Sequence, residues 1–288
     1  KSKQLLFKCC RSTNAGVPQG TLSGPNDFKL LVNGLTFDIP YIKYVDDFTL
    51  ASVSIDFDDL SLQNSANALC NWSTDNGMII NTKKTKEMVI HFGKRVDRRS
   101  LKNITMNGAE IERVEKFKLL GVYFSSDLSW TVHVDYIVSK ALRRLFVVCQ
   151  LVNARVPTKD IVEIYCAIVR SVLEYACPVW HGGLTKSQSA DIENVQKRYL
   201  RIIYPQSSYN EALHSSGLQR LDDRRESITR KLFIRVKNEG HDLNKLLQRK
   251  IHDDLKPQTR DTYPYKIPSA KTSRLGRSFI NYCLSKRM

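Results

Sequence analysis

Residues 41–54 read YIKYVDDFTLASVS, in which two short apolar runs flank the pair Asp46-Asp47. Runs rich in Tyr, Ile, Val, Phe and Thr, interrupted by a polar pair, predict a β-hairpin with both carboxylates at its turn. Two negative charges so close together repel each other, which makes the pair costly unless a divalent cation binds there. The alternative is an ordinary acidic turn, since Tyr-x-Asp-Asp arises by chance in roughly a few per cent of chains this long.

A glycine-rich turn, Gly16-Val17-Pro18-Gln19-Gly20, precedes the hairpin. Two glycines and a proline fix a tight turn where backbone can approach a flat or phosphorylated ligand, and Gln19 offers a donor and an acceptor. The apolar spacing after it predicts a helix from Leu22 to about Leu35. Taken alone, the same five residues are also compatible with a plain loop.

The apolar pattern predicts mixed structure up to about residue 128 and helices beyond it. In the first part we expect a helix over Leu60–Asn76, stopped by Gly77, and strands at Glu87–Phe92 and Phe117–Phe124. After Trp130 the period becomes helical. The expected helices are Val134–Val152, Ile161–Leu173, a third after Thr185 (whose TKSQ fits a capping box) and extending to Ile203, and Asp222–Asn238.

The charge distribution points to a polyanionic partner. A hydrophobic share of 42% and a charged share of 26% are typical of a globular chain, but the net charge is +16. Residues 1–60 hold 6 Lys/Arg and 7 Asp/Glu, a net of −1, whereas residues 61–288 hold 39 and 22, a net of +17. The candidate contacts to a nucleic-acid backbone are Lys197, Arg198, Arg201, Arg224 and Arg225. For each residue the alternative is an ordinary solvated helix face.

Seven cysteines without zinc-type spacing favour reduced thiols and an intracellular location. No uninterrupted apolar stretch approaches 18 residues, so we expect no membrane span. The chain begins at Lys1 rather than at Met, which suggests a fragment.

The order of several blocks resembles the reverse transcriptases of non-LTR retrotransposons. Gly16–Phe28 and Lys43–Phe48 are similar to two neighbouring conserved blocks of retroelement polymerases. Trp72 with Met78, Asn81 and Lys84-Thr85 is similar to the next block, and Phe117–Phe124 to the primer-grip hairpin. The helical residues that resemble the region after the polymerase in jockey- and CR1-like LINE elements are Ser171–Thr185 and Ile192–Ile203, with Arg274–Ile280 similar to that group's ending.

This resemblance implies an RNA-directed DNA polymerase of α+β class. Residues 1–128 would be an incomplete palm, 129–255 a helical thumb and C-terminal region, and 256–288 a basic, flexible tail. The cofactor would be Mg²⁺ (or Mn²⁺), and the partners an RNA template, a DNA primer and deoxynucleoside triphosphates, in a ribonucleoprotein of nucleus and cytoplasm. The implied site residues are Asp46 and Asp47 for the metal, with Asp46 the principal ligand; Lys84 near the leaving pyrophosphate; Pro18, Gln19, Gly20 and Tyr44 for template and nucleotide; and Leu120, Gly121 and Val122 for the primer.

Two departures from the family pattern bear on activity. Asn26-Asp27 replaces a hydrophobic pair, and the family's other catalytic Asp lies before the glycine-rich turn, where this chain has only 15 residues and none of them acidic. Asp38 and Asp56–Asp59 follow that turn and cannot substitute. We therefore expect the chain to be inactive alone. The alternatives are a non-catalytic nucleic-acid-binding remnant of such an element, or a generic basic helical scaffold.

Overall fold

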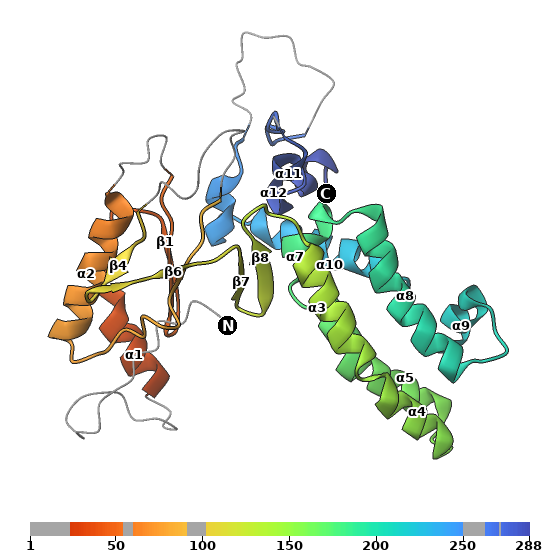
Figure 1. The fold of residues 1–288 in the computed structure, drawn as a ribbon. Helices are drawn as coiled ribbons and strands as arrows, with labels where there is room; N and C mark the ends of the chain where they lie inside the picture. The colour runs from red at the N-terminus through yellow and green to blue at the C-terminus, as the bar shows by residue number, and fades with distance from the viewer. Residues whose placement is uncertain (1–23, 54–59, 91–101, 250–262, 271) are drawn as a thin grey trace, which may run out of the picture. The chain divides into compact units, whose positions relative to one another are not determined.

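The computed structural model describes residues 24–53, 60–90, 102–249, 263–270 and 272–288 (Figure 1). The chain divides into two compact units, Lys1–Leu128 and Ser129–Met288. The first unit combines helices with small sheets and the second is built almost entirely of helices, so the expected mixture of helix and strand is confirmed. No helix among the described residues is long and apolar enough to cross a bilayer.

The first unit contains two helices and four two-stranded sheets within its described residues. The helices are α1 (Gly24–Asn33) and α2 (Ser61–Asp75). The antiparallel pairs are β1 (Tyr41–Tyr44) with β2 (Asp47–Leu50), β4 (Thr105–Met106) with β5 (Ala109–Glu110), and β7 (Lys116–Leu119) with β8 (Val122–Ser125); β3 (Lys86–Glu87) pairs in parallel with β6 (Glu112–Arg113). Of the strand expected at Glu87–Phe92, the described part is regular only to Glu87, and residues 91–101 are outside the described ranges.

One apolar cluster organises the first unit. Helix α2 buries Ala66, Leu69 and Cys70 on one stripe, as its 3.6-residue period predicts, and ends where Gly77 adopts φ 65°. Phe48 of β2 packs into the same cluster, so the hairpin is attached to this core. The buried members are Val32, Leu35, Phe48, Ala66, Leu69, Cys70, Ile80, Met106 and Ile111.

The second unit is a succession of helices. They are α3 (Thr131–Leu142), α4 (Leu145–Asn153), α5 (Thr158–Tyr165), the π-helix η2 (Cys166–Arg170), α6 (Ser171–Glu174), α7 (Cys177–Trp180), the 3₁₀ turn η3 (His181–Gly183), α8 (Lys186–Ile203), α9 (Tyr209–Ser216), α10 (Leu221–Val236), the 3₁₀ turn η4 (Asp242–Leu246), α11 (Ser273–Gly276) and α12 (Phe279–Ser285). The capping box at the start of α8 is confirmed, because Thr185 Oγ1 accepts from the Gln188 amide while the Gln188 side chain accepts from the Thr185 amide.

The single helix expected over Val134–Val152 is instead two, α3 and α4. The Ala141 carbonyl accepts the Arg144 amide at 3.0 Å, a tightened last turn of α3. The same carbonyl accepts the Tyr199 hydroxyl of α8 at 2.6 Å. A side chain from a distant helix therefore occupies the carbonyl at the break, which periodicity alone does not reveal.

The segment 256–288, expected to be a flexible tail, packs into the core of the second unit over part of its described residues. Cys283 and Leu284 of α12 are buried against Phe233 and Val236 of α10. The Tyr282 hydroxyl also donates to Glu226 Oε2 at 2.5 Å. The Pro, Ser and Lys/Arg content suggested mobility, but the apolar residues of α12 are spaced for one buried face and form part of the core.

Candidate functional site

The acidic hairpin has a two-residue turn. Tyr44 pairs with Asp47 across the strands, which leaves Val45 and Asp46 in the turn. Val45 has φ 52°, a left-handed conformation that is strained for a β-branched side chain. Such strain persists only where the surrounding structure fixes it, and it is frequent at functional sites.

Asp46 and Asp47 differ in environment. Asp46 is half-buried on the turn, whereas Asp47, the first residue of β2, is only 7% exposed. Asp47 Oδ1 is buried and accepts no hydrogen bond from the described residues. Burial, and secondarily the charge of Asp46, raise the pKa of Asp47 to about 6. A buried carboxylate oxygen without a donor, beside a second carboxylate, fits a hard divalent cation that takes oxygen ligands.

One face of the hairpin contacts the rest of the first unit through two cross-strand neighbours. Lys43 and Phe48 are cross-strand partners, so their side chains share a face. Phe48 is 2% exposed within the apolar cluster, and the Lys43 ammonium donates to the carbonyls of Val32 (2.7 Å) and Leu35. The neighbouring strand residue Tyr44 points the other way and is 59% exposed.

Lys84 lies in a separate turn of the first unit. Its amide donates to the Asn81 carbonyl and side-chain oxygen, both at 3.1 Å, and its side chain is exposed. Among the described residues, no hydrogen bond or ion pair joins Lys84 to Asp46 or Asp47. Pro18, Gln19 and Gly20, expected to line the template and nucleotide pocket, lie outside the described residues.

The hairpin β7–β8 carries the residues expected to hold a primer. Leu120 and Gly121 occupy its turn with φ 45° and 88°, positive at both central positions as a tight right-twisted hairpin requires. Leu120 is exposed at this turn, but Val122 is buried. The side chain of Val122 packs inward, so its expected contact with a primer would have to be made by its backbone.

Three of the five residues expected to contact a nucleic-acid backbone form one exposed group on α8. Arg201 lies four residues after Lys197 and three after Arg198, one helical turn away, and all three side chains face solvent. No ion pair engages them within the described part of the chain, although the Lys197 ammonium lies 5.4 Å from the Tyr209 ring centre. Their charges are available to a phosphate backbone.

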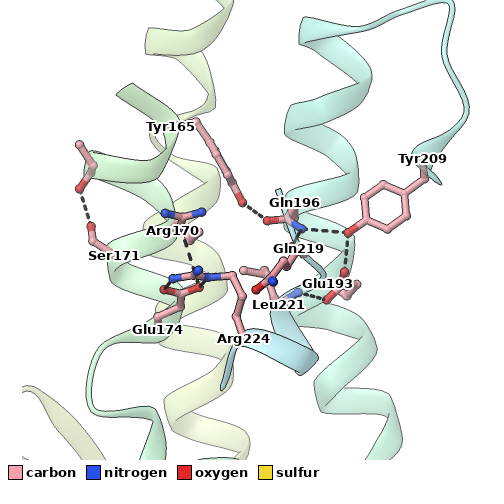
Figure 2. A network of polar contacts seen from close by, with 11 residues as sticks. Tyr165, Arg170, Ser171, Glu174, Glu193, Gln196, Tyr209, Gln219, Leu221 and Arg224 are labelled. Atoms are coloured by element: carbon pink, nitrogen blue, oxygen red, sulfur yellow. Dashed lines mark hydrogen bonds and ion pairs between the residues drawn. The ribbon is translucent and has the colours of Figure 1, made fainter. Parts of the chain in front are cut away.

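The other two arginines have internal roles, which corrects their expected exposure. Arg224 forms a two-pronged ion pair with the half-buried Glu174, as Figure 2 shows. Arg225 is 0% exposed; its Nη2 donates to Ser189 Oγ at 3.0 Å and its guanidinium lies 5.9 Å from the Trp180 ring centre. Neither residue presents a free cation to a nucleic acid in this structure.

A buried polar network joins α8 to the segment before α10 (Figure 2). Gln196 accepts from the Tyr165 hydroxyl at 2.9 Å, and it donates to the Tyr209 oxygen and the Gln219 carbonyl, each at 3.0 Å. Glu193 accepts from the Tyr209 hydroxyl and, at 3.0 Å, from the Leu221 amide. The sequence contained one usable signal, because Glu193 and Gln196 fall beside the apolar stripe of α8 rather than on its exposed face.

Comparison with known protein families gives a match, which lies in the first unit. A family described as reverse transcriptase (RNA-dependent DNA polymerase) matches residues 7–124. No curated protein and no solved structure matches the chain. The match supports a reverse transcriptase and includes the acidic hairpin. Among the described residues, no group of three or more His, Cys, Asp or Glu side chains is arranged to hold a metal ion.

Proposed function

We propose that this chain is part of the RNA-directed DNA polymerase of a non-LTR retrotransposon of the jockey- and CR1-like LINE type. The hairpin Tyr41–Leu50 would carry its catalytic carboxylates. The observation that carries the proposal is the buried Asp47 Oδ1, which lacks a donor and lies beside Asp46 inside the reverse transcriptase match. A carboxylate in that state is prepared for a cation rather than for a structural hydrogen bond.

In this proposal, residues of the first unit have different roles in nucleotide addition. Mg²⁺ or Mn²⁺, when bound, would supply positive charge to the primer hydroxyl and the incoming phosphate. Asp46 and Asp47 would hold it, and Phe48 anchors the strand that carries Asp47. Lys84, exposed in its turn, would stabilise or protonate the leaving pyrophosphate.

The nucleic acids would contact both units. By the family resemblance, Pro18, Gln19, Gly20 and Tyr44 would line the template and nucleotide pocket, and the turn Leu120-Gly121 would approach the primer end. Lys197, Arg198 and Arg201 would neutralise phosphates of the RNA template or DNA primer. As part of such an element's ribonucleoprotein, the chain would occur in the cytoplasm and nucleus.

The full chain alone should not extend a primer. Two-metal phosphoryl transfer needs carboxylates beyond one adjacent pair, and no Asp or Glu occurs among the residues before Gly16. The described residues contain no third ligand near the hairpin pair. We therefore propose that catalysis requires at least one further carboxylate besides Asp46 and Asp47.

Paramagnetic broadening by Mn²⁺ tests the metal site directly. In the isotopically labelled chain, low Mn²⁺ concentrations should broaden the amide signals of Tyr44–Phe48 before those of α2 or α8. Asp46→Asn or Asp47→Asn should weaken this selectivity, while Asp38→Asn, which removes an exposed charge from the same unit, should not. Broadening spread evenly over surface carboxylates would contradict the proposal.

A second candidate is a nucleic-acid-binding remnant without chemistry, which the exposed cations on α8 favour. The two functions separate in a combined experiment: a remnant binds RNA or DNA but gives no selective Mn²⁺ response at the hairpin. The polymerase proposal requires both properties.

A further inference from the structure

We propose that Lys43 is a positioning residue that fixes the Asp46-Asp47 hairpin to the C-terminal end of helix α1. The role of the hairpin as carrier of catalytic carboxylates rests on the polymerase function proposed above. The tie itself rests only on contacts of the first unit.

The ammonium of Lys43 binds two carbonyls at the end of α1, and the Val32 carbonyl also accepts the Leu35 amide at 3.2 Å. Helix α1 ends at Asn33, and the last carbonyls of a helix have no partner within it. Lys43 Nζ donates to the Val32 carbonyl at 2.7 Å and to the Leu35 carbonyl just beyond the helix. A cation is favourable there because the C-terminal end of a helix carries partial negative charge.

The Lys43 ammonium also contacts an aromatic ring of its own strand. Lys43 Nζ lies 5.4 Å from the centre of the Tyr41 ring, within the range of a cation–π contact. Burial lowers the pKa of Lys43, so placing the ammonium here has a desolvation cost. The two carbonyls and the ring offset that desolvation cost. An apolar side chain of similar length would avoid the cost, but it could not donate to the carbonyls.

The tie and the apolar anchor act on the same face of the hairpin. Lys43 pairs with Phe48, one on each side of the turn, and Phe48 packs against the cluster that contains Val32 and Leu35. On the opposite face, Ile42 is 68% exposed. An isolated two-stranded hairpin is marginally stable, so contacts such as those of Lys43 and Phe48 are needed to hold the carboxylates near α1.

Placement matters because the reacting groups must align closely. Lys43 precedes Asp46 by three residues, and α1 is the helix that follows the glycine-rich turn assigned to the nucleotide pocket. A displacement of about 1 Å between reacting groups can reduce the rate about a hundredfold. Lys43 thus acts through Asp46 and Asp47 without touching substrate itself.

Amide hydrogen exchange on the full chain tests the tie. Lys43→Met removes the donors and keeps an unbranched apolar stem; Lys43→Arg retains donors; Lys29→Met removes an exposed cation from α1 itself. We expect Lys43→Met to accelerate exchange in the hairpin and in the last turn of α1 by about tenfold or more, with α2 less affected. Lys43→Arg should recover part of the protection, and Lys29→Met should match the original chain.

The overturning results are equally definite. Exchange in Lys43→Met equal to that of Lys29→Met, or no recovery with Lys43→Arg, would refute the tie. If Lys43→Met unfolds the whole first unit, the Lys43 ammonium signal is instead observed by NMR in the unsubstituted chain. A slowly exchanging Lys43 ammonium signal, absent for Lys29, supports the tie, and its absence refutes it. Primer extension plays no part in these readouts, so failure of the polymerase proposal remains distinguishable.

Discussion

Arg224 of α10 donates through Nε and Nη2 to the two carboxylate oxygens of Glu174, fifty positions earlier in the chain. Arg170 also lies 3.9 Å from the same carboxylate. Glu174 ends α6 just before the backbone turns at Ala176, which has φ 51°. The pair therefore fastens α10 to that turn, and a residue that the sequence presents as a surface cation has a structural role.

Substitutions of the α8 cations should affect RNA affinity, whereas substitution of Arg224 should affect stability. Arg198→Ala and Arg201→Ala should each lower affinity for RNA, and each should reduce the salt dependence of log K by about 1 if the residue contacts one phosphate. Arg224→Ala should leave affinity per folded molecule unchanged but reduce the free energy of unfolding of the second unit by about 2 kcal/mol, because Glu174 loses both hydrogen bonds from Arg224 and keeps only Arg170 at 3.9 Å. Fluorescence anisotropy at several salt concentrations and thermal unfolding measure the two quantities. Equal loss of affinity in all three variants would contradict this assignment.

The raised pKa of Asp47 predicts a pH-dependent cost of ionisation. The pKa is about 6 in the folded chain and 3.8 in the reference state, so the folded state binds more protons between these values. Stability of the first unit should therefore fall as pH rises from about 4 to above 6. Asp47→Asn cannot ionise, so its stability relative to the original chain should increase by roughly 1–3 kcal/mol over that range.

Exchange free energies of α2 amides at about pH 4 and about pH 7.5 measure this difference. Added Mn²⁺ should reduce it at the higher pH, since a bound cation offsets the charge of Asp47. A difference between the two chains that does not change with pH would show that Asp47 is not ionising at an elevated pKa.

Gly183→Ala should be strongly destabilising for steric reasons. A Cβ at Gly183 would lie 2.2 Å from Trp130 Nε1, which is closer than any allowed contact. We expect a loss of about 1–3 kcal/mol in the unfolding free energy of the second unit, together with a changed Trp fluorescence. Gly240→Ala is the matched control, because a Cβ there meets nothing within 4 Å. Equal stability of the two variants would contradict the packing of Trp130.

The parts of the fold that follow from local signals could be predicted from the sequence. The hairpin Tyr41–Leu50 follows from two β-prone runs around a polar turn, and the start of α8 follows from the Thr185–Gln188 capping box. The break between α3 and α4 could not be predicted, because its carbonyl partner Tyr199 is 58 residues away. The packing of α12 was missed because the composition of the whole tail outweighed its short apolar pattern.

The same distinction applies to the candidate site. The sequence indicated that Asp46 and Asp47 share a hairpin tip, but not that Asp47 is the buried member. A count of charges likewise treats Arg198 and Arg225 alike, although one faces solvent and the other is enclosed beside Trp180. Whether a helical side chain faces solvent depends on which helices pack together, and this packing is set by contacts between segments far apart in the sequence.

Primer extension on an RNA template, in a polypeptide that joins this chain to an N-terminal palm segment bearing an acidic strand, tests the account most directly. We predict extension by the joined polypeptide and none by the chain alone. Asp46→Asn should abolish extension, and Asp47→Asn should leave a measurable residue, with both variants still binding RNA and giving an unchanged circular dichroism spectrum. Undiminished extension in Asp46→Asn, or extension by the chain alone, would contradict the claim that this hairpin supplies part of a shared catalytic site.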